Sequence, residues 1–204
     1  MCEYSHCQRG RALNPLTFTL MFPLDHVEKW AKEYPYDNDD RKAFGAGKNI
    51  LAGDFSRANL EGIVHWKSNR RITLLRDNTN SEIEDALRLA LSAKEPRSAI
   101  AVLRGLRGVE LPVASAIMTA IHSDQYTVAD WRAMQALGQP NADYYRIDFY
   151  ILQYLPECRR LASAAGVSLR TFDKALWTWS LKHEKGHMGQ LIHEEAILGF
   201  PDSQ

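Results

Sequence analysis

The spacing of apolar residues is the feature that most restricts the fold of this chain. Apolar side chains recur three and four residues apart in one segment after another, as at Ile83, Ala86 and Leu87. This is the period of one face of an α-helix. The alternation with period two that indicates β-strands is found only at residues 17–20. The sequence therefore predicts an all-α protein.

Start and stop signals divide the chain into helices of ordinary length. Asp25 followed by Glu28 has the pattern of a capping box, which marks the beginning of a helix. The sequence GAGKN around Ala46 predicts a flexible turn, because glycine favours turns. Helices are expected to begin near residues 25, 54–57, 81, 98, 112, 130, 144 and 168.

The length and composition indicate a globular protein. With 204 residues, of which 45% are hydrophobic, the chain can bury a core as one compact domain or as two small lobes that share a cleft. No repeat or linker marks a boundary, so we expect a single domain over residues 1–204 that acts as a monomer. Twenty-five basic residues balance twenty-five acidic ones. A polyanionic partner would therefore be held by a local patch of charge.

The same composition gives expectations about the compartment. No apolar run approaches the roughly 18 residues that cross a bilayer, and the first residues lack the apolar region of a signal peptide. Three scattered cysteines do not make a disulfide framework, which fits a reducing environment. We therefore expect a cytoplasmic protein without a membrane partner. The cysteines are Cys2, Cys7 and Cys158.

A glycine turn joins two short apolar helical segments in the middle of the chain. The sequence LRGVELPVA, from Leu106 to Ala114, places Gly108 in the turn and Pro112 in the first turn of the second helix, where proline is favoured. It predicts a helical hairpin over about residues 98–122. A tight turn before a helix leaves backbone N–H groups without partners, and these can bind a phosphate without reading sequence.

This hairpin resembles the helix-hairpin-helix element of the DNA glycosylase superfamily that includes endonuclease III and the adenine-mismatch and oxidised-purine glycosylases. That family has an essential aspartate at a fixed distance from the first hairpin glycine, and Asp130 lies at the same distance, 22 residues after Gly108. The resemblance is detailed over residues 100–138, while residues 66–68 and 169–177 look like a bacterial branch of the superfamily. It implies a helix-hairpin-helix glycosylase fold, a DNA partner, and base excision from DNA, as in DNA repair.

Asp130 is the candidate catalytic carboxylate. It could face the anomeric carbon of a nucleotide flipped out of the DNA stack, where it would stabilise positive charge on the sugar or orient the attacking water. The alternative is that Asp130 caps the helix that begins at Trp131, a role that aspartate often has. The two roles are compatible.

Two positions depart from the family pattern. Glu110 stands where the family usually has a second glycine, and it brings a negative charge next to the expected phosphate. Pro112 stands where the bifunctional members have the lysine that forms a Schiff base with the sugar. We therefore expect a monofunctional enzyme that uses water, with Lys67 as the alternative source of an amine.

Other residues are candidates for contact with DNA. The segment WKSNRR combines an aromatic ring with three cations, as strand-contacting loops do, but it could equally be a solvated helix end. The candidates for phosphate contact are Lys67, Arg70, Arg104, Arg107, Gly108, Val109, Glu110, Pro112, Val113 and Arg132. The candidates for a base pocket are Trp66, Trp131 and Tyr145, although such aromatic residues more often belong to a core.

No metal site or cofactor is expected. His183 and His187 lie four residues apart, but the HExxH motif of zinc hydrolases is absent. Cys2, His6 and Cys7 could chelate zinc, but unrelated thiols at a chain terminus are the simpler interpretation. Three cysteines cannot form the four-cysteine iron–sulfur site of some relatives. A monovalent cation at the hairpin stays open.

The function expected from these features is hydrolysis of the N-glycosidic bond of a base in DNA. Two alternatives are a non-catalytic DNA-binding module and a protein-interaction domain. Glu110 and the neutral net charge favour the non-catalytic DNA-binding module, whereas the spacing of Asp130 favours the enzyme. The sequence leaves the base open among damaged, mismatched and enzymatically modified bases, and with it the choice between repair and defence against foreign DNA.

Overall fold

The structure is a computed structural model that describes residues 16–184. This part of the chain consists of helices joined by short loops and contains no β-strand, which confirms the all-α prediction. The α-helices are α1 (Val27–Lys32), α2 (Asp37–Leu51), α3 (Arg57–Lys67), α4 (Ile72–Arg76), α5 (Asn80–Ser92), α6 (Pro96–Leu103), α7 (Leu111–Ile121), α8 (Trp131–Ala136), α9 (Ile147–Phe149), α10 (Leu155–Ala164) and α11 (Leu169–His183). Two 3-10 turns, η1 (Leu24–His26) and η2 (Asn69–Arg71), precede α1 and α4, and the π-helical turn η3 (Tyr150–Tyr154) joins α9 to α10.

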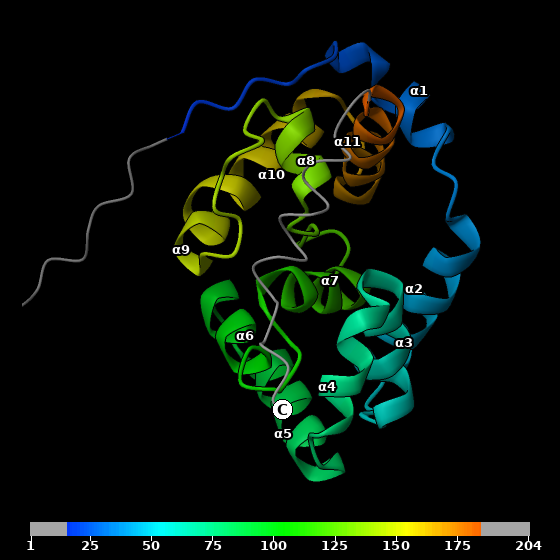
Figure 1. Cartoon of the computed structure of the whole chain (residues 1–204), viewed down its shortest axis with the longest axis vertical. Coiled ribbons are helices and arrows are strands. Elements are labelled where there is room, and N and C mark those ends of the chain that lie inside the picture. Colours follow the sequence, from blue (N-terminus) through cyan, green and yellow to red (C-terminus); the bar gives the residue numbers. More distant parts are fainter. Residues whose placement is uncertain (1–15, 185–204) are drawn as a thin grey trace, which may run out of the picture.

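Helix α7 is the centre of the fold. All its residues are buried, as expected of a helix that is apolar on every side. It packs against α2, α3 and α6, while α1, α8 and α10 pack against α11. Figure 1 shows α7 between the helices α2–α6 and the group formed by α1 and α8–α11. The first and the last α-helices of the described chain are therefore neighbours.

The turn predicted at GAGKN is wrong, because these residues lie inside α2. Gly47 faces α7 so closely that a Cβ atom at this position would lie 2.1 Å from the carbonyl oxygen of Ala120. The glycine is thus required by the packing of two helices and not by a turn. Tertiary packing overrides the local preference of glycine here.

The predicted capping box at Asp25 is also wrong, because no side chain caps η1 or α1. A capping box is found instead at the start of α5. The Thr79 hydroxyl accepts a hydrogen bond from the Glu82 backbone N–H (3.2 Å), and the Glu82 carboxylate accepts one from the Thr79 backbone N–H (2.6 Å). This helix begins within a residue of its predicted start.

The predicted helical hairpin is confirmed and consists of α6 and α7. Gly108 lies in the turn with a φ of 81°, a conformation that favours glycine. The side chain of Asn78 holds the turn: its oxygen accepts the Arg107 backbone N–H (2.9 Å), and its amide donates to the Arg107 carbonyl (3.1 Å). The turn is therefore fixed to the loop before α5.

No helix in the described part of the chain is both long and apolar enough to span a bilayer.

Candidate functional site

A cavity of about 370 Å³ opens among α2, α3, α8 and α11. Lys67, at the end of α3, and Asp130, just before α8, both line it. Trp66, a third candidate from the sequence, lines the same cavity. The other lining residues are Tyr34, Tyr36, Asp39, Lys42, Gly62, His65, Val128, Ala133, Arg170, Asp173 and Trp177.

Asp130 is held at both of its carboxylate oxygens. Oδ1 accepts a hydrogen bond from the Arg132 backbone N–H (2.9 Å), so Asp130 is the N-cap of α8, as one of the two interpretations predicted. Oδ2 forms an ion pair with Nζ of Lys67. The two side chains are only 13% and 16% exposed. With so little exposure, each charge depends on the other for neutralisation.

The segment that leads to Asp130 is fixed by three buried hydrogen bonds. The hydroxyl of Tyr150 donates to the Thr127 carbonyl (2.7 Å), and the hydroxyl of Tyr154 donates to the carbonyl of Val128 (2.8 Å). The backbone N–H of Ala129 donates to Oγ of Ser115 (2.9 Å). Burial raises the pKa of both tyrosines well above the ordinary value, so their hydroxyls stay protonated donors. Asp130 therefore follows three consecutive residues with anchored backbones.

Both tyrosines belong to the π-helical turn η3. A π-helix has more residues per turn than an α-helix, and such turns occur frequently at functional sites. Here the turn brings two hydroxyl groups four residues apart onto two neighbouring carbonyls.

Arg170 joins the helices that form the cavity wall. Its Nη2 binds the Asp40 carboxylate of α2 at 2.6 and 2.8 Å, and its Nη1 binds Asp173 on α11. Trp66 of α3 donates from Nε1 to Oδ1 of Asp40 (3.1 Å). Burial raises the pKa of Asp173 even though Arg170 lies beside it. This cluster fixes the ends of α2, α3 and α11 relative to one another.

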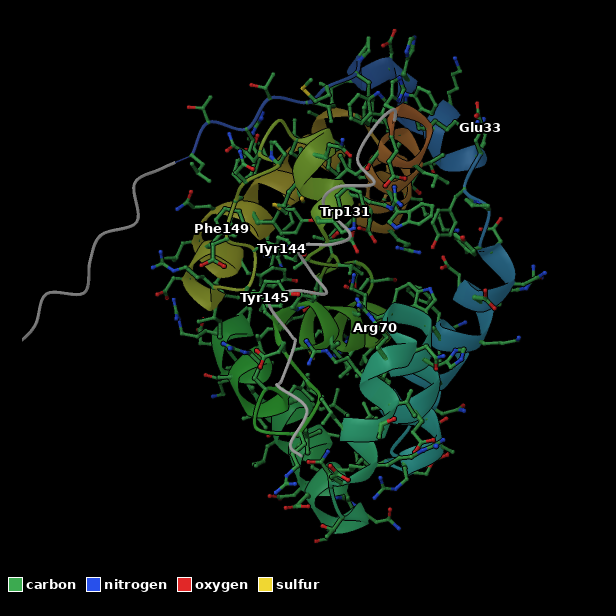
Figure 2. The ribbon with its side chains drawn as sticks, viewed as in Figure 1. Glu33, Arg70, Trp131, Tyr144, Tyr145 and Phe149 are labelled. Atoms are coloured by element: carbon green, nitrogen blue, oxygen red, sulfur yellow. The ribbon has the colours of Figure 1, made fainter. Side chains whose placement is uncertain are left out.

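The aromatic residues of the cavity differ in part from those expected. Trp66 lines it, but Trp131 and Tyr145 do not. Tyr145 is 39% exposed and its ring is tilted against that of Tyr144, with 4.9 Å between the centroids, on the loop between α8 and α9 (Figure 2). Tyr34, Tyr36 and Trp177 complete the cavity wall.

The base-pocket candidates named from the sequence did not include Tyr34, Tyr36 or Trp177. Trp177 and Trp179 are two residues apart in α11, so they lie on different faces of this helix. Trp177 lines the cavity, while Trp179 packs against Phe22 and stacks on His183 with 4.4 Å between centroids. Nothing local in the sequence shows which of the two faces the cavity.

Fewer side chains of the hairpin are exposed for contact with DNA than the sequence predicted. Val109, Pro112 and Val113 are buried, so any contact that they make with DNA would come from the backbone. Among the described residues no acceptor is found for the backbone N–H groups of Gly108 and Glu110. These groups keep the donor capacity that a phosphate site requires.

The charged candidates near the hairpin lie on the surface. Arg104 and Glu110 form an ion pair at 3.2 Å, so the negative charge of Glu110 has a partner within the protein. Arg107 is exposed, with Asp77 at 3.9 Å. Arg70 is exposed on η2 and is labelled in Figure 2. Surface pairs of this kind contribute little to stability.

Arg132 lies beside the cavity rather than on the surface. Its guanidinium stacks on the rings of Trp131 and Trp177, at 4.6 and 5.0 Å from their centroids, and pairs with Glu184 at 3.0 Å. It therefore supports the Trp177 wall while its backbone N–H binds Asp130.

Within residues 16–184, no three histidine, cysteine or acidic side chains come together as metal ligands. His187, His193, Cys2, His6 and Cys7 lie outside the described residues. Cys158 is buried with a free thiol, and burial raises its pKa well above the ordinary value.

Comparisons with known protein families, with curated proteins and with solved structures find no match to this chain.

Proposed function

We propose that this protein is a DNA glycosylase that hydrolyses the N-glycosidic bond of a damaged, mismatched or modified base, with Asp130 as its catalytic carboxylate. The observation that carries the proposal is the position of Asp130, which lies in the wall of a cavity and follows the hairpin at the spacing noted in the sequence. The volume of about 370 Å³ falls in the range of roughly 300–1,000 Å³ typical of small-ligand sites. A flipped base is a ligand of this class.

In the proposed reaction, water attacks the anomeric carbon of the sugar while the bond from this carbon to the base nitrogen breaks. The base leaves with the bonding electrons and is protonated, and the water loses a proton to the medium. The Asp130 carboxylate stabilises the positive charge that develops on the sugar. Anchoring of residues 127–129 keeps this carboxylate in place, which reduces the reorganisation that the reaction requires.

The same proposal interprets the fold as a helix-hairpin-helix glycosylase fold with two lobes. Helices α2–α6 would form one lobe, and α1 with α8–α11 the other, with α7 between them. The free N–H groups of Gly108 and Glu110 would bind a DNA phosphate. Arg104, released from Glu110, and Arg107 would add positive charge at this point. The enzyme would act on DNA as a cytoplasmic monomer.

A second activity, cleavage of the abasic strand, is favoured by one observation. The Lys67 amine contacts the proposed catalytic carboxylate, although it comes from a different helix than the lysine of the bifunctional relatives. A lysine in this position could attack the anomeric carbon in place of water. Pro112, whose nitrogen is an amide without a proton, cannot do so. We propose the hydrolytic reaction, in which Lys67 holds Asp130.

Reaction with borohydride separates these two activities. The protein is incubated with a substrate duplex and borohydride, and the strand is analysed with and without alkali. We expect strand cleavage only after alkali, and no covalent adduct. A trapped adduct that disappears in Lys67→Ala would show that the lysine, not water, is the nucleophile.

The substrate is found by screening duplexes that each carry one modified or mismatched base. The glycosylase proposal predicts release of a free base from at least one class of duplex. Binding to every duplex without release from any of them would favour the non-catalytic DNA-binding module. Absence of DNA binding at low salt would favour the protein-interaction domain.

A further inference from the structure

We propose that the cavity accepts an electrically neutral base and rejects a cationic one, such as a base alkylated on a ring nitrogen. This inference rests on the proposed function only in that the cavity is taken to hold a nucleobase. The charged side chains that already surround the aromatic rings of the cavity support it.

The aromatic wall is the cluster of three rings that Tyr34, Tyr36 and Trp177 contribute to the cavity lining. Trp177 meets Tyr34 and Tyr36 edge-on, with centroid distances of 5.5 and 5.3 Å, and the two tyrosines meet each other at 5.9 Å. Electron-rich rings of this kind can stack on a neutral base, and in other circumstances they bind cations. Their surroundings decide which of the two they favour.

Cations of the protein itself already lie over these rings. Arg170 and Lys174 lie 5.3 and 5.0 Å from the centroid of Tyr34, and Arg132 lies 5.0 Å from the centroid of Trp177. A ring that attracts one cation gains little from a second, because the two positive charges repel each other through the thin ring. These cations have carboxylate partners of their own: Lys174 pairs with Asp37 and Asp40, Arg170 with Asp40 and Asp173, and Arg132 with Glu184. The charges around the wall are therefore already balanced, and a cationic base stacked on it would add a positive charge without a counterion.

The carboxylates of the cavity also have partners. Asp130 pairs with Lys67, Asp173 pairs with Arg170, and Asp39, at the rim, lies 3.8 Å from Lys42. The first two pairs are largely shielded from water. A cationic base that took Asp130 or Asp173 as its counterion would compete with the cation already bound there. This would leave the Lys67 ammonium without its partner, or the Arg170 guanidinium with Asp40 alone. A neutral base requires no counterion.

Pairs of nucleosides with the methyl group on different nitrogens provide a test, because at neutral pH they differ by one proton and its positive charge. Methylation of 2′-deoxyadenosine or 2′-deoxycytidine at the base-pairing ring nitrogen gives a cation at neutral pH, whereas methylation at the exocyclic amino group gives a neutral nucleoside. Binding of each to the full chain is measured by the NMR shifts of the indole N–H groups. We expect the neutral member of at least one pair to bind about tenfold more tightly or better.

Two lysine variants test whether the preference comes from the cavity. Lys174→Met removes the cation over Tyr34 and should narrow the difference between the two members of a pair. Lys182→Met, on the same helix, removes a cation 6.0 Å from Trp30, a ring that does not line the cavity, and should leave the difference unchanged.

Equal or tighter binding of the cationic nucleosides would overturn the inference, and so would failure of all four nucleosides to bind. A different result would contradict the glycosylase proposal alone: the neutral bases bind with the expected preference, but no base is released from any DNA duplex.

Discussion

Gly108 has two independent reasons to be a glycine. Its φ of 81° is unfavourable for other residues, and a Cβ atom would lie 2.9 Å from the Arg71 carbonyl oxygen and 3.0 Å from the backbone nitrogen of Leu75. The contact with α4 was not visible in the sequence, where the glycine indicated only a turn. The hairpin is therefore fixed in space by packing as well as by its own backbone.

Replacement of Gly108 by alanine should lower the free energy of unfolding more than replacement of a glycine that has only a positive φ. Gly166 has a φ of 67° and nothing within 4 Å of a Cβ position. We expect Gly166→Ala to lower the free energy of unfolding by about 1 kcal/mol, and Gly108→Ala by about 2–4 kcal/mol because of the added clash. Urea unfolding of both variants measures this, and equal losses would contradict the packing role.

At the scale of the element, the π-helical turn η3 is the feature that determines where Asp130 lies. The sequence predicted a helix over about residues 144–164, which agrees with α9, η3 and α10 taken together. It gave no sign of a π-helical turn, because Tyr150 and Tyr154 are also compatible with an ordinary α-helix. The backbone carbonyls that accept hydrogen bonds from their hydroxyls belong to Thr127 and Val128, which lie 23 and 26 residues earlier in the chain, just before Asp130.

Removal of either hydroxyl should loosen this segment without unfolding the protein. For Tyr150→Phe and Tyr154→Phe we expect a loss of about 1 kcal/mol in unfolding free energy. Single-turnover base release should fall by about tenfold, because the carboxylate loses its fixed position. Affinity for undamaged duplex should stay within twofold.

Tyr126→Phe is the matched control, since the Tyr126 hydroxyl has no hydrogen-bond partner among the described residues. If it slows base release as much as the two η3 variants do, the anchoring role of η3 is wrong.

For the whole molecule, the sequence predicted the hairpin and the starts of most helices, because both depend on local signals such as period and turn residues. It predicted the N-cap role of Asp130 for the same reason. It missed α2 and α4. The ion pair with Lys67, the Arg170 cluster and the tyrosines of the cavity depend on the packing of α2, α3, α8 and α11, and no local pattern encodes that packing. Gly47 shows most directly that local patterns do not reveal packing, because this residue, typical of turns, lies inside a helix.

The neutral net charge of the chain also has a consequence at this scale. Any attraction to DNA must come from a few groups near the hairpin, so we expect weak binding to undamaged duplex with a shallow dependence on salt. Recognition would then rest mainly on the cavity and on the flipped base rather than on the DNA backbone.

The most direct test of the account is base release by Asp130→Asn in single turnover, on a substrate identified by the screen. Asparagine is as good an N-cap as aspartate, so the fold and DNA binding should be retained, although the Lys67 ammonium loses its ion-pair partner and the free energy of unfolding should fall. We expect the rate to fall by about 100-fold or more. Asp39→Asn, which removes a carboxylate at the cavity rim, should change it by less than about threefold. An unchanged rate in Asp130→Asn would contradict the central claim that this carboxylate acts on the sugar.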